Sequence, residues 1–143
     1  PGFLANRMQH ALSREAFALI DEGVASPEDV DAAVRFGFGF RFLAAGPVLQ
    51  RDHAGIEVHT AAEATMYPTL SNTDVPAKAL RDKVARGELG MKTGKGFFDW
   101  PEDRKLAERA RYDHLLRQGL ALLAPELPAI ARTKISAPRN QQP

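Results

Sequence analysis

Residues Phe3–Glu22 have the sequence FLANRMQHALSREAFALIDE, and the fold expected for this chain depends most on them. The apolar side chains of this segment recur every three or four positions, as they do on one face of an α-helix. Gly23 follows directly and can end the helix. We therefore predict a helix of about five turns, long enough to be the central scaffold of the domain.

Further helices are predicted along the rest of the chain. Ser26 and Pro27 are typical of a helix start, because the serine hydroxyl can accept a backbone N–H and proline suits the first helical position. A turn, Gly37–Phe40, follows this helix. The other predicted helices cover residues 48–53, 56–66, 76–86 and 102–123. No segment has the period-two alternation of a β-strand, so we predict an all-α fold, a helical bundle in one domain.

The apolar stripes of the first two helices are expected to form the core, with part of that surface available for dimerisation. These stripes consist of Met8, Leu12, Leu19, Val30 and Val34. The polar, proline-bearing tail at residues 133–143 is predicted to be disordered.

The composition excludes several classes of protein. A net charge of +1 argues against nucleic acid or a membrane surface as the main partner. The absence of cysteine excludes disulfides, thiolate metal sites and a cysteine nucleophile, and no other metal site is predicted. It also fits a reducing compartment, so we expect a cytoplasmic protein.

No apolar run approaches the roughly 20 residues that a membrane span needs, and no signal peptide is predicted. Because the chain begins with Pro1 rather than methionine, we expect it to be part of a longer protein.

Residues Gly87–Trp100, GELGMKTGKGFFDW, combine glycines and lysines as phosphate-binding loops do. The P-loop pattern needs its lysine after the second glycine, whereas Lys92 and Thr93 precede Gly94 here. The dinucleotide pattern GxGxxG also fails, because Asp99 occupies the position of the third glycine. We predict a glycine-rich turn anchored by its aromatic end rather than a self-sufficient nucleotide site. That conformational role leaves the lysines and the threonine unexplained.

Four motifs occur in order between Pro1 and about Trp100 and together resemble one known family. They are PGFLANR, EGVASPEDVDAAVRFGFGF, GPVLQRDHAGIEV and GELGMKTGKGFFDW. They are similar to the C-terminal domain of L-3-hydroxyacyl-CoA dehydrogenases, which include 3-hydroxybutyryl-CoA dehydrogenases and λ-crystallin-like relatives. The resemblance covers some seven-tenths of the chain.

The resemblance implies one part of a two-domain dehydrogenase of the 6-phosphogluconate-dehydrogenase-like architecture. In that family an N-terminal Rossmann domain binds NAD and supplies a catalytic His–Glu pair. An all-α C-terminal domain closes the active-site cleft and forms a homodimer. Residues 1–100 would be the core of this domain and residues 101–132 a helical extension of it. The reaction implied is oxidation of 3-hydroxyacyl-CoA to 3-ketoacyl-CoA in fatty-acid metabolism, which this chain alone would not catalyse.

Two residues acquire roles from the resemblance. Asn6 in PGFLANR matches an asparagine that supports the active-site histidine and the substrate, and an amide can both donate and accept hydrogen bonds. Lys92 matches a lysine that reaches the NAD cofactor across the domain cleft. The alternatives are a polar residue near a helix start for Asn6 and an ordinary solvated lysine for Lys92.

Arg41 marks a departure from the common family pattern. The sequence FRFLAA, residues 40–45, lies between the glycine turn and Gly46 in place of a short proline-containing link. This longer form resembles relatives that oxidise free hydroxy acids, such as gulonate and carnitine dehydrogenases. Arg41 could bind a substrate carboxylate there. The alternatives are an ordinary surface arginine or an arginine in an interdomain ion pair. Besides a dehydrogenase domain for CoA esters and one for free hydroxy acids, a third hypothesis for the chain is a non-catalytic helical dimerisation module. Such a module would need neither Asn6 nor Lys92.

Overall fold

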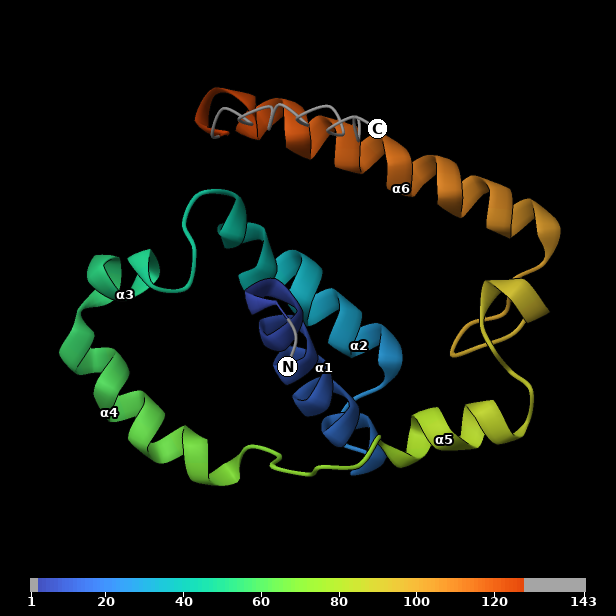
Figure 1. Cartoon of the computed structure of the whole chain (residues 1–143), viewed down its shortest axis with the longest axis horizontal. Helices are drawn as coiled ribbons and strands as arrows, with labels where there is room; N and C mark the ends of the chain where they lie inside the picture. The colour runs from blue at the N-terminus through green and yellow to red at the C-terminus, as the bar shows by residue number, and fades with distance from the viewer. Residues whose placement is uncertain (1–2, 128–143) are drawn as a thin grey trace, which may run out of the picture.

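The structure, a computed structural model, describes residues 3–127, and these residues form helices without a β-strand (Figure 1). The all-α prediction is therefore confirmed for this range. The tail at residues 133–143, predicted to be disordered, lies outside the described residues. The α-helices are α1 (Leu4–Asp21), α2 (Pro27–Ala32), α3 (Leu49–Ala54), α4 (Ile56–Met66), α5 (Lys78–Ala85) and α6 (Glu102–Leu123).

Carboxylates in the C-terminal half of α1 hold two distant parts of the chain. Asp21 Oδ2 accepts the backbone N–H of Lys78 at 2.6 Å, and Oδ1 accepts that of Ala79 at 2.8 Å. Glu15 Oε2 accepts the backbone N–H of Ser71 at 2.7 Å. The residue before α5, Ala77, provides no side-chain cap of its own. Asp21 therefore supplies from α1 the cap that α5 lacks.

The second predicted helix is confirmed at its start and differs at its end. Ser26 Oγ accepts the N–H of Asp29 at 3.1 Å, and Asp29 returns a carboxylate oxygen to the Ser26 N–H at 3.2 Å. This capping box begins α2. The chain then widens into a π-helical segment, η1 (Ala33–Phe38), in which Gly37 leaves helical geometry, and tightens into a 3₁₀ segment, η2 (Gly39–Leu43). The predicted turn is thus an irregular helical continuation.

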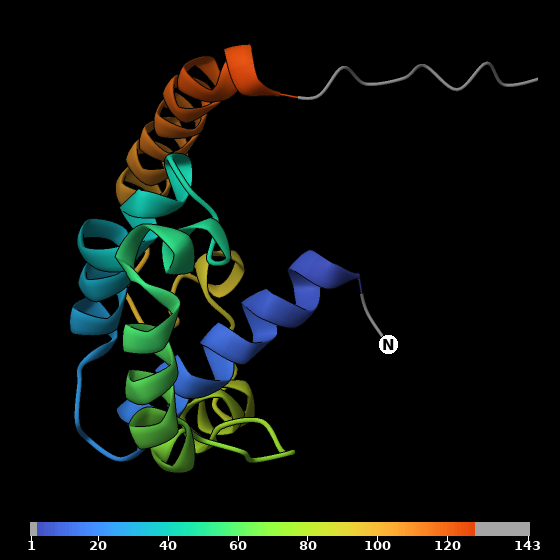
Figure 2. The ribbon, with the colours of Figure 1, turned by 90° about the vertical axis from the view of Figure 1, so that its left-hand side faces the viewer.

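Helix α6 extends across one end of the molecule, while the first turns of α1 project from another side (Figures 1 and 2). The C-terminal end of α6 lies near η2 and the segment that follows it. Leu123 and Leu127 line a hollow there together with Phe42, Leu43 and Leu49. None of the helices within residues 3–127 is long and apolar enough to cross a bilayer.

Apolar side chains remain widely exposed in this fold. Within residues 3–127 only Gly96 is buried, and the accessible surface of the chain is 12236 Å². The prediction of a core was wrong for Met8 and Leu12, which are 50% and 41% exposed, because the N-terminal half of α1 projects beyond its neighbours (Figure 2). The other predicted core residues, Leu19, Val30 and Val34, are half-buried.

Candidate functional site

The glycine-rich turn is held by its own backbone. Gly90 N–H donates to Lys95 O at 2.8 Å, and Trp100 N–H donates to Gly94 O at 2.8 Å. Gly90 and Gly94 have φ values of 86° and 78°, which side-chain-bearing residues rarely adopt. A Cβ on Gly96 would lie 2.8 Å from the Gly90 Cα atom. The glycines are therefore conformational, as predicted.

Thr93 closes the same turn from inside. Its Oγ1 atom accepts the N–H of Leu89 at 2.9 Å and lies 3.2 Å from Gly90 O and 3.1 Å from Lys95 O, to either of which it can donate. This use of the hydroxyl explains why a threonine occurs at this position. It also leaves the hydroxyl no free role toward a phosphate.

Glu88 forms ion pairs with three basic side chains around the turn. Its carboxylate oxygens lie 2.8 Å from Lys83 Nζ, 3.3 Å from Arg86 Nη2 and 3.5 Å from Lys95 Nζ. The hydrogen bond from the Lys83 ammonium lowers the pKa of Glu88 to about 2, and the charge of Arg86 adds to the shift. Lys95, which had no assigned role in the sequence, is therefore part of an ion-pair cluster.

Lys92 differs from Lys95. It lies in the 3₁₀ segment η4 (Met91–Thr93) and is exposed, and it makes no hydrogen bond or ion pair with any residue in the described range. The turn is rigid because its other polar groups bind one another. Lys92 is thus a cation on a fixed support, available to a partner outside this domain.

Asn6 lies in the first turn of α1 and is exposed. The helix begins after Phe3, and no side chain caps it. The Asn6 amide forms no hydrogen bond with another residue of the range 3–127, and its place in the first turn agrees with the alternative of a polar residue near a helix start. Its donor and acceptor groups are both available.

Arg41 lies in η2 and is exposed, without an ion pair to the described part of the chain. Its neighbour Phe42 packs edge-on against Phe38, with ring centroids 5.9 Å apart. This aromatic contact keeps the backbone of η2 in place while the guanidinium faces solvent.

The structure does not bring these three candidate residues together. They lie on the start of α1, on η2 and on the turn between α5 and α6, and no hydrogen bond or ion pair joins any two of them. Phe97 of the turn contacts Phe17 of α1 with centroids 5.5 Å apart. Phe17 is roughly 16 Å along the helix from Asn6. A ligand that contacts both Asn6 and the turn must therefore be long, and a small ligand can contact only one of them.

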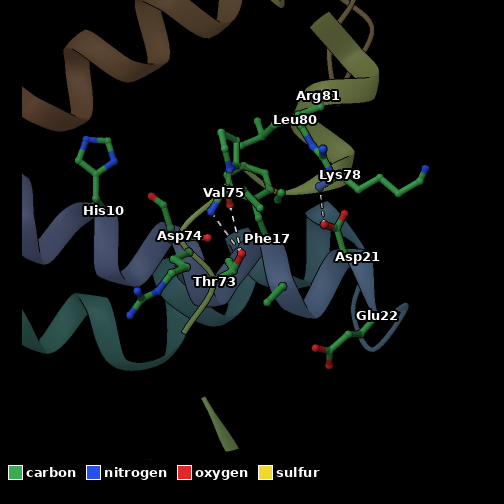
Figure 3. Close-up of a pocket in the computed structure, with 15 residues that line it drawn as sticks. His10, Phe17, Asp21, Glu22, Thr73, Asp74, Val75, Lys78, Leu80 and Arg81 are labelled. Atoms are coloured by element: carbon green, nitrogen blue, oxygen red, sulfur yellow. Dashed lines mark hydrogen bonds between the residues drawn. The ribbon is translucent and has the colours of Figure 1, made fainter. Parts of the chain in front are cut away.

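A groove of about 700 Å³ lies between α1, the residues before α5 and α5 itself (Figure 3). Phe17, Val75 and Leu80 provide apolar walls, and the carboxylate of Asp21 is already used as the α5 cap. The groove contains none of the three candidate residues. Within residues 3–127, no three His, Asp or Glu side chains are grouped as metal ligands.

Sequence reasoning missed Asp21, Glu15 and Glu88. All three act on groups that become neighbours only in the fold. The weak signal that could have indicated Asp21 is the absence of a capping side chain before α5, which required an acceptor from elsewhere.

Residues 2–100 match the family described as the 3-hydroxyacyl-CoA dehydrogenase C-terminal domain. With the all-α fold, this match defines the class of protein, the helical C-terminal domain of a dehydrogenase family. The chain belongs to the 3-hydroxyacyl-CoA dehydrogenase C-terminal domain family, and the resemblance based on the four motifs is confirmed.

Several relatives match more than half of the chain. A 5-formyl-3-hydroxy-2-methylpyridine 4-carboxylate 5-dehydrogenase from Mesorhizobium japonicum is 39% identical over 114 residues, 78% of this chain and 37% of that protein. A 3-hydroxyadipyl-CoA dehydrogenase from Escherichia coli is 34% identical over 107 residues, 73% of this chain and 22% of that protein. An L-carnitine dehydrogenase from Pseudomonas syringae pv. syringae is 40% identical over 87 residues, 59% of this chain and 27% of that protein.

A solved structure has the same fold. The crystal structure of a 5-formyl-3-hydroxy-2-methylpyridine 4-carboxylic acid 5-dehydrogenase, described as an NAD⁺-dependent dismutase, aligns with a TM-score of 0.76 and 32% identity. The alignment covers 88% of this chain and 39% of that one. The chain therefore spans less than two fifths of the length of each of these relatives.

The close approach of Gly96 to Gly90 generates a stability prediction. Gly96→Ala should destabilise the chain by roughly 1–3 kcal/mol, because the new methyl group meets a backbone atom that cannot move freely. Gly46→Ala is the matched control, since a Cβ at Gly46 has no neighbour within 4 Å and no positive φ to adopt. Urea denaturation at one fixed chain concentration measures both variants. Equal stability of the two variants would contradict the assigned role of Gly96.

Proposed function

We propose that this chain is the cleft-closing and dimerising C-terminal domain of an NAD-dependent dehydrogenase that oxidises a hydroxyl group to a ketone. Residues 1–100 are the family core in this proposal, and residues 101–132 extend it. An N-terminal Rossmann domain binds NAD and supplies a His–Glu pair, so the chain alone is inactive. One observation carries the proposal: Asn6 and Lys92, the two residues that match family site residues, are exposed and unused within the described domain.

Asn6 positions groups on both sides of the cleft in this proposal. The Glu of the His–Glu pair accepts the single N–H of the neutral imidazole, so the other nitrogen removes the hydroxyl proton. The Asn6 amide oxygen accepts the N–H that this transfer creates on the imidazolium. The amide N–H₂ donates to the substrate oxygen, on which negative charge develops as the base removes the hydroxyl proton. The first turn of α1 suits this task because no capping contact within the described residues occupies the side chain.

Lys92 fits an anionic or ribosyl oxygen of NAD. The fit rests on contrast within one turn, since Lys95 is paired with Glu88 and Thr93 is bonded to the backbone, while Lys92 is exposed. Bound NAD supplies the hydride acceptor. Lys92 contributes a positive charge from the second wall of the cleft and so helps to orient the cofactor when the domains close.

Two substrate classes compete, a CoA ester and a free hydroxy carboxylate. The Escherichia coli relative is named for a CoA ester. The Mesorhizobium relative is named for a carboxylate and the Pseudomonas relative for carnitine, itself a hydroxy carboxylate. The exposed Arg41 guanidinium favours the carboxylate, to which it can donate two parallel hydrogen bonds. We therefore place the free hydroxy carboxylate first.

Dimerisation follows from apolar surface that the chain does not cover. Leu4, Phe36 and Phe40 are 75%, 76% and 68% exposed, and no described apolar side chain is fully buried. Apolar side chains left exposed to this degree in a folded domain favour contact with another protein surface. A purely structural dimerisation module would not require the exposed amide of Asn6 or the cation of Lys92, which favour the enzyme.

The role of Asn6 predicts a loss of turnover in the enzyme that contains this chain. Asn6→Ala should lower kcat about 100-fold, because one hydrogen-bonding group that is preorganised for the transition state is removed. Gln9→Ala is the control, since Gln9 is another exposed amide on α1 that the family motif does not assign to the site. Steady-state kinetics provide the test. A kcat within twofold of the wild type for Asn6→Ala would exclude this residue from the site.

The contrast between the two lysines of the turn predicts a difference in cofactor binding. Lys92→Ala should raise KM for NAD about tenfold, equivalent to losing about 1.4 kcal/mol of binding free energy. Lys95→Ala breaks only the ion pair with Glu88 and should change KM for NAD less than twofold. Initial rates measured over a range of NAD concentrations separate the variants. Identical effects of both substitutions would show that Lys92 has no specific contact with the cofactor.

The proposed contact between Arg41 and a substrate carboxylate predicts which substrates an Arg41 substitution affects. With free 3-hydroxybutyrate or carnitine as substrate, Arg41→Ala should raise KM at least about tenfold, because the charge-assisted pair to the carboxylate is lost. With 3-hydroxybutyryl-CoA the same substitution should have little effect, since the carboxylate is esterified. If the wild type oxidises only the CoA ester, the enzyme belongs to the second substrate class.

A further inference from the structure

The helical path of the chain changes pitch directly before Arg41. Within residues 3–127 the only π-helical segment is η1, and it leads into η2, which carries Arg41. The two segments connect α2 to the loop before α3 (Figure 1). Gly39 begins η2, and its backbone N–H donates to Val34 O, five residues earlier. Because π-turns inside helices occur frequently at functional sites, the join between η1 and η2 is a candidate for a role in substrate binding.

Gly39 is required at this join by space rather than by conformation. Its φ and ψ values of −66° and −33° are helical values that most residues adopt. A Cβ atom at Gly39 would overlap the Val34 carbonyl oxygen and lie 3.2 Å from the carbonyl carbon. No other glycine of residues 3–127 has a backbone atom so close to the place of its missing side chain. The turn from Val34 to Gly39 therefore closes because residue 39 has no side chain.

Contacts around the join fix Arg41 relative to Gly39. Arg41 O accepts the backbone N–H groups of the two alanines that follow η2, each at 3.0 Å. Phe38, on the η1 side of the join, packs edge-on against Phe42 of η2, with ring centroids 5.9 Å apart. A displacement at Gly39 is therefore transmitted to Arg41, two residues further on, rather than absorbed between them.

We propose that Gly39 is a positioning residue for the substrate carboxylate, because the π-turn that it closes determines where Arg41 lies. The inference rests on the proposed function, in which Arg41 binds the carboxylate of a free hydroxy acid, and it names the residue that fixes this contact. A guanidinium meets both oxygens of a carboxylate only in a planar, parallel arrangement. Groups that bind in this way must be held within about 0.5 Å of the productive geometry.

A methyl group at residue 39 disturbs this geometry selectively. The Val34 carbonyl and residue 39 must separate by roughly 1 Å before an ordinary contact distance is restored. The separation changes the direction of η2 relative to η1 and displaces Arg41 by more than the paired hydrogen bonds tolerate. Asn6 and Lys92 lie on other elements, α1 and η4, so their contacts are unaffected.

Steady-state kinetics of the enzyme that contains this chain test the inference, with free 3-hydroxybutyrate or carnitine as substrate. Gly39→Ala should raise KM for the carboxylate substrate about tenfold and change KM for NAD less than about twofold. Gly46→Ala is the matched control and should leave both KM values unchanged, because a Cβ atom at Gly46 has no neighbour within 4 Å. Circular dichroism checks that each variant keeps the helix content of the wild type.

A double variant separates positioning from a general loss of structure. In an enzyme that already carries Arg41→Ala, Gly39→Ala should raise KM for the carboxylate less than about twofold, because the group that it positions is gone. Two independent effects would instead multiply to about 100-fold. Multiplied effects, or a KM within about twofold of the wild type for Gly39→Ala alone, would overturn the inference.

A second substitution applies even if Gly39→Ala does not fold. Phe38→Leu removes the ring contact with Phe42 without adding bulk to the join, and should raise KM for the carboxylate about threefold. Phe36→Leu is its control, since Phe36 is 76% exposed and has no ring partner among residues 3–127. Equal effects of the two leucine substitutions on this KM would contradict the inference.

Failure of this inference is distinguishable from failure of the proposed function. If Arg41→Ala leaves KM for the carboxylate unchanged, or if the wild type oxidises only the CoA ester, the proposed contact of Arg41 fails and this inference fails with it. If Arg41→Ala raises this KM and Gly39→Ala does not, the contact of Arg41 stands and only the role of Gly39 is overturned.

Discussion

The Asp21 carboxylate, which accepts the first two N–H groups of α5, is the interaction on which the described arrangement depends most. It joins segments 57 residues apart in sequence, and α5 in turn leads into the glycine-rich turn. Glu15 and Phe17 make two further long-range contacts from the same half of α1. The C-terminal half of α1 therefore builds the domain, because distant segments are attached to it by hydrogen bonds and ring packing.

The N-terminal half of α1 has a different task. Its side chains are exposed, it projects from the molecule, and it carries Asn6 (Figure 2). The turn that carries Lys92 is fixed to the other half of the same helix through Phe97. A single rigid helix thus sets the spacing between two polar groups that the described chain does not itself use. This spacing suits a site completed by another domain better than one contained in this chain.

Local sequence signals predicted most of the helices. The Ser26 capping box and the apolar periodicity of Phe3–Glu22 depend only on residues within a few positions of one another, and both appear in the structure. The predicted core failed at Met8 and Leu12, since periodicity identifies an apolar face without specifying what covers it. The pairing of Lys95 with Glu88 could not be predicted from the sequence, because it depends on how the turn folds.

The central claim is that this domain completes a cofactor site that it does not contain. The most direct measurement is isothermal titration calorimetry of NAD into the 143-residue chain and into the enzyme that includes its preceding domain. We predict no measurable binding to the chain and clear binding to the longer enzyme, because Lys92 alone offers one charge where a dinucleotide needs an enclosing site. Saturable micromolar binding of NAD to the 143-residue chain would contradict the claim.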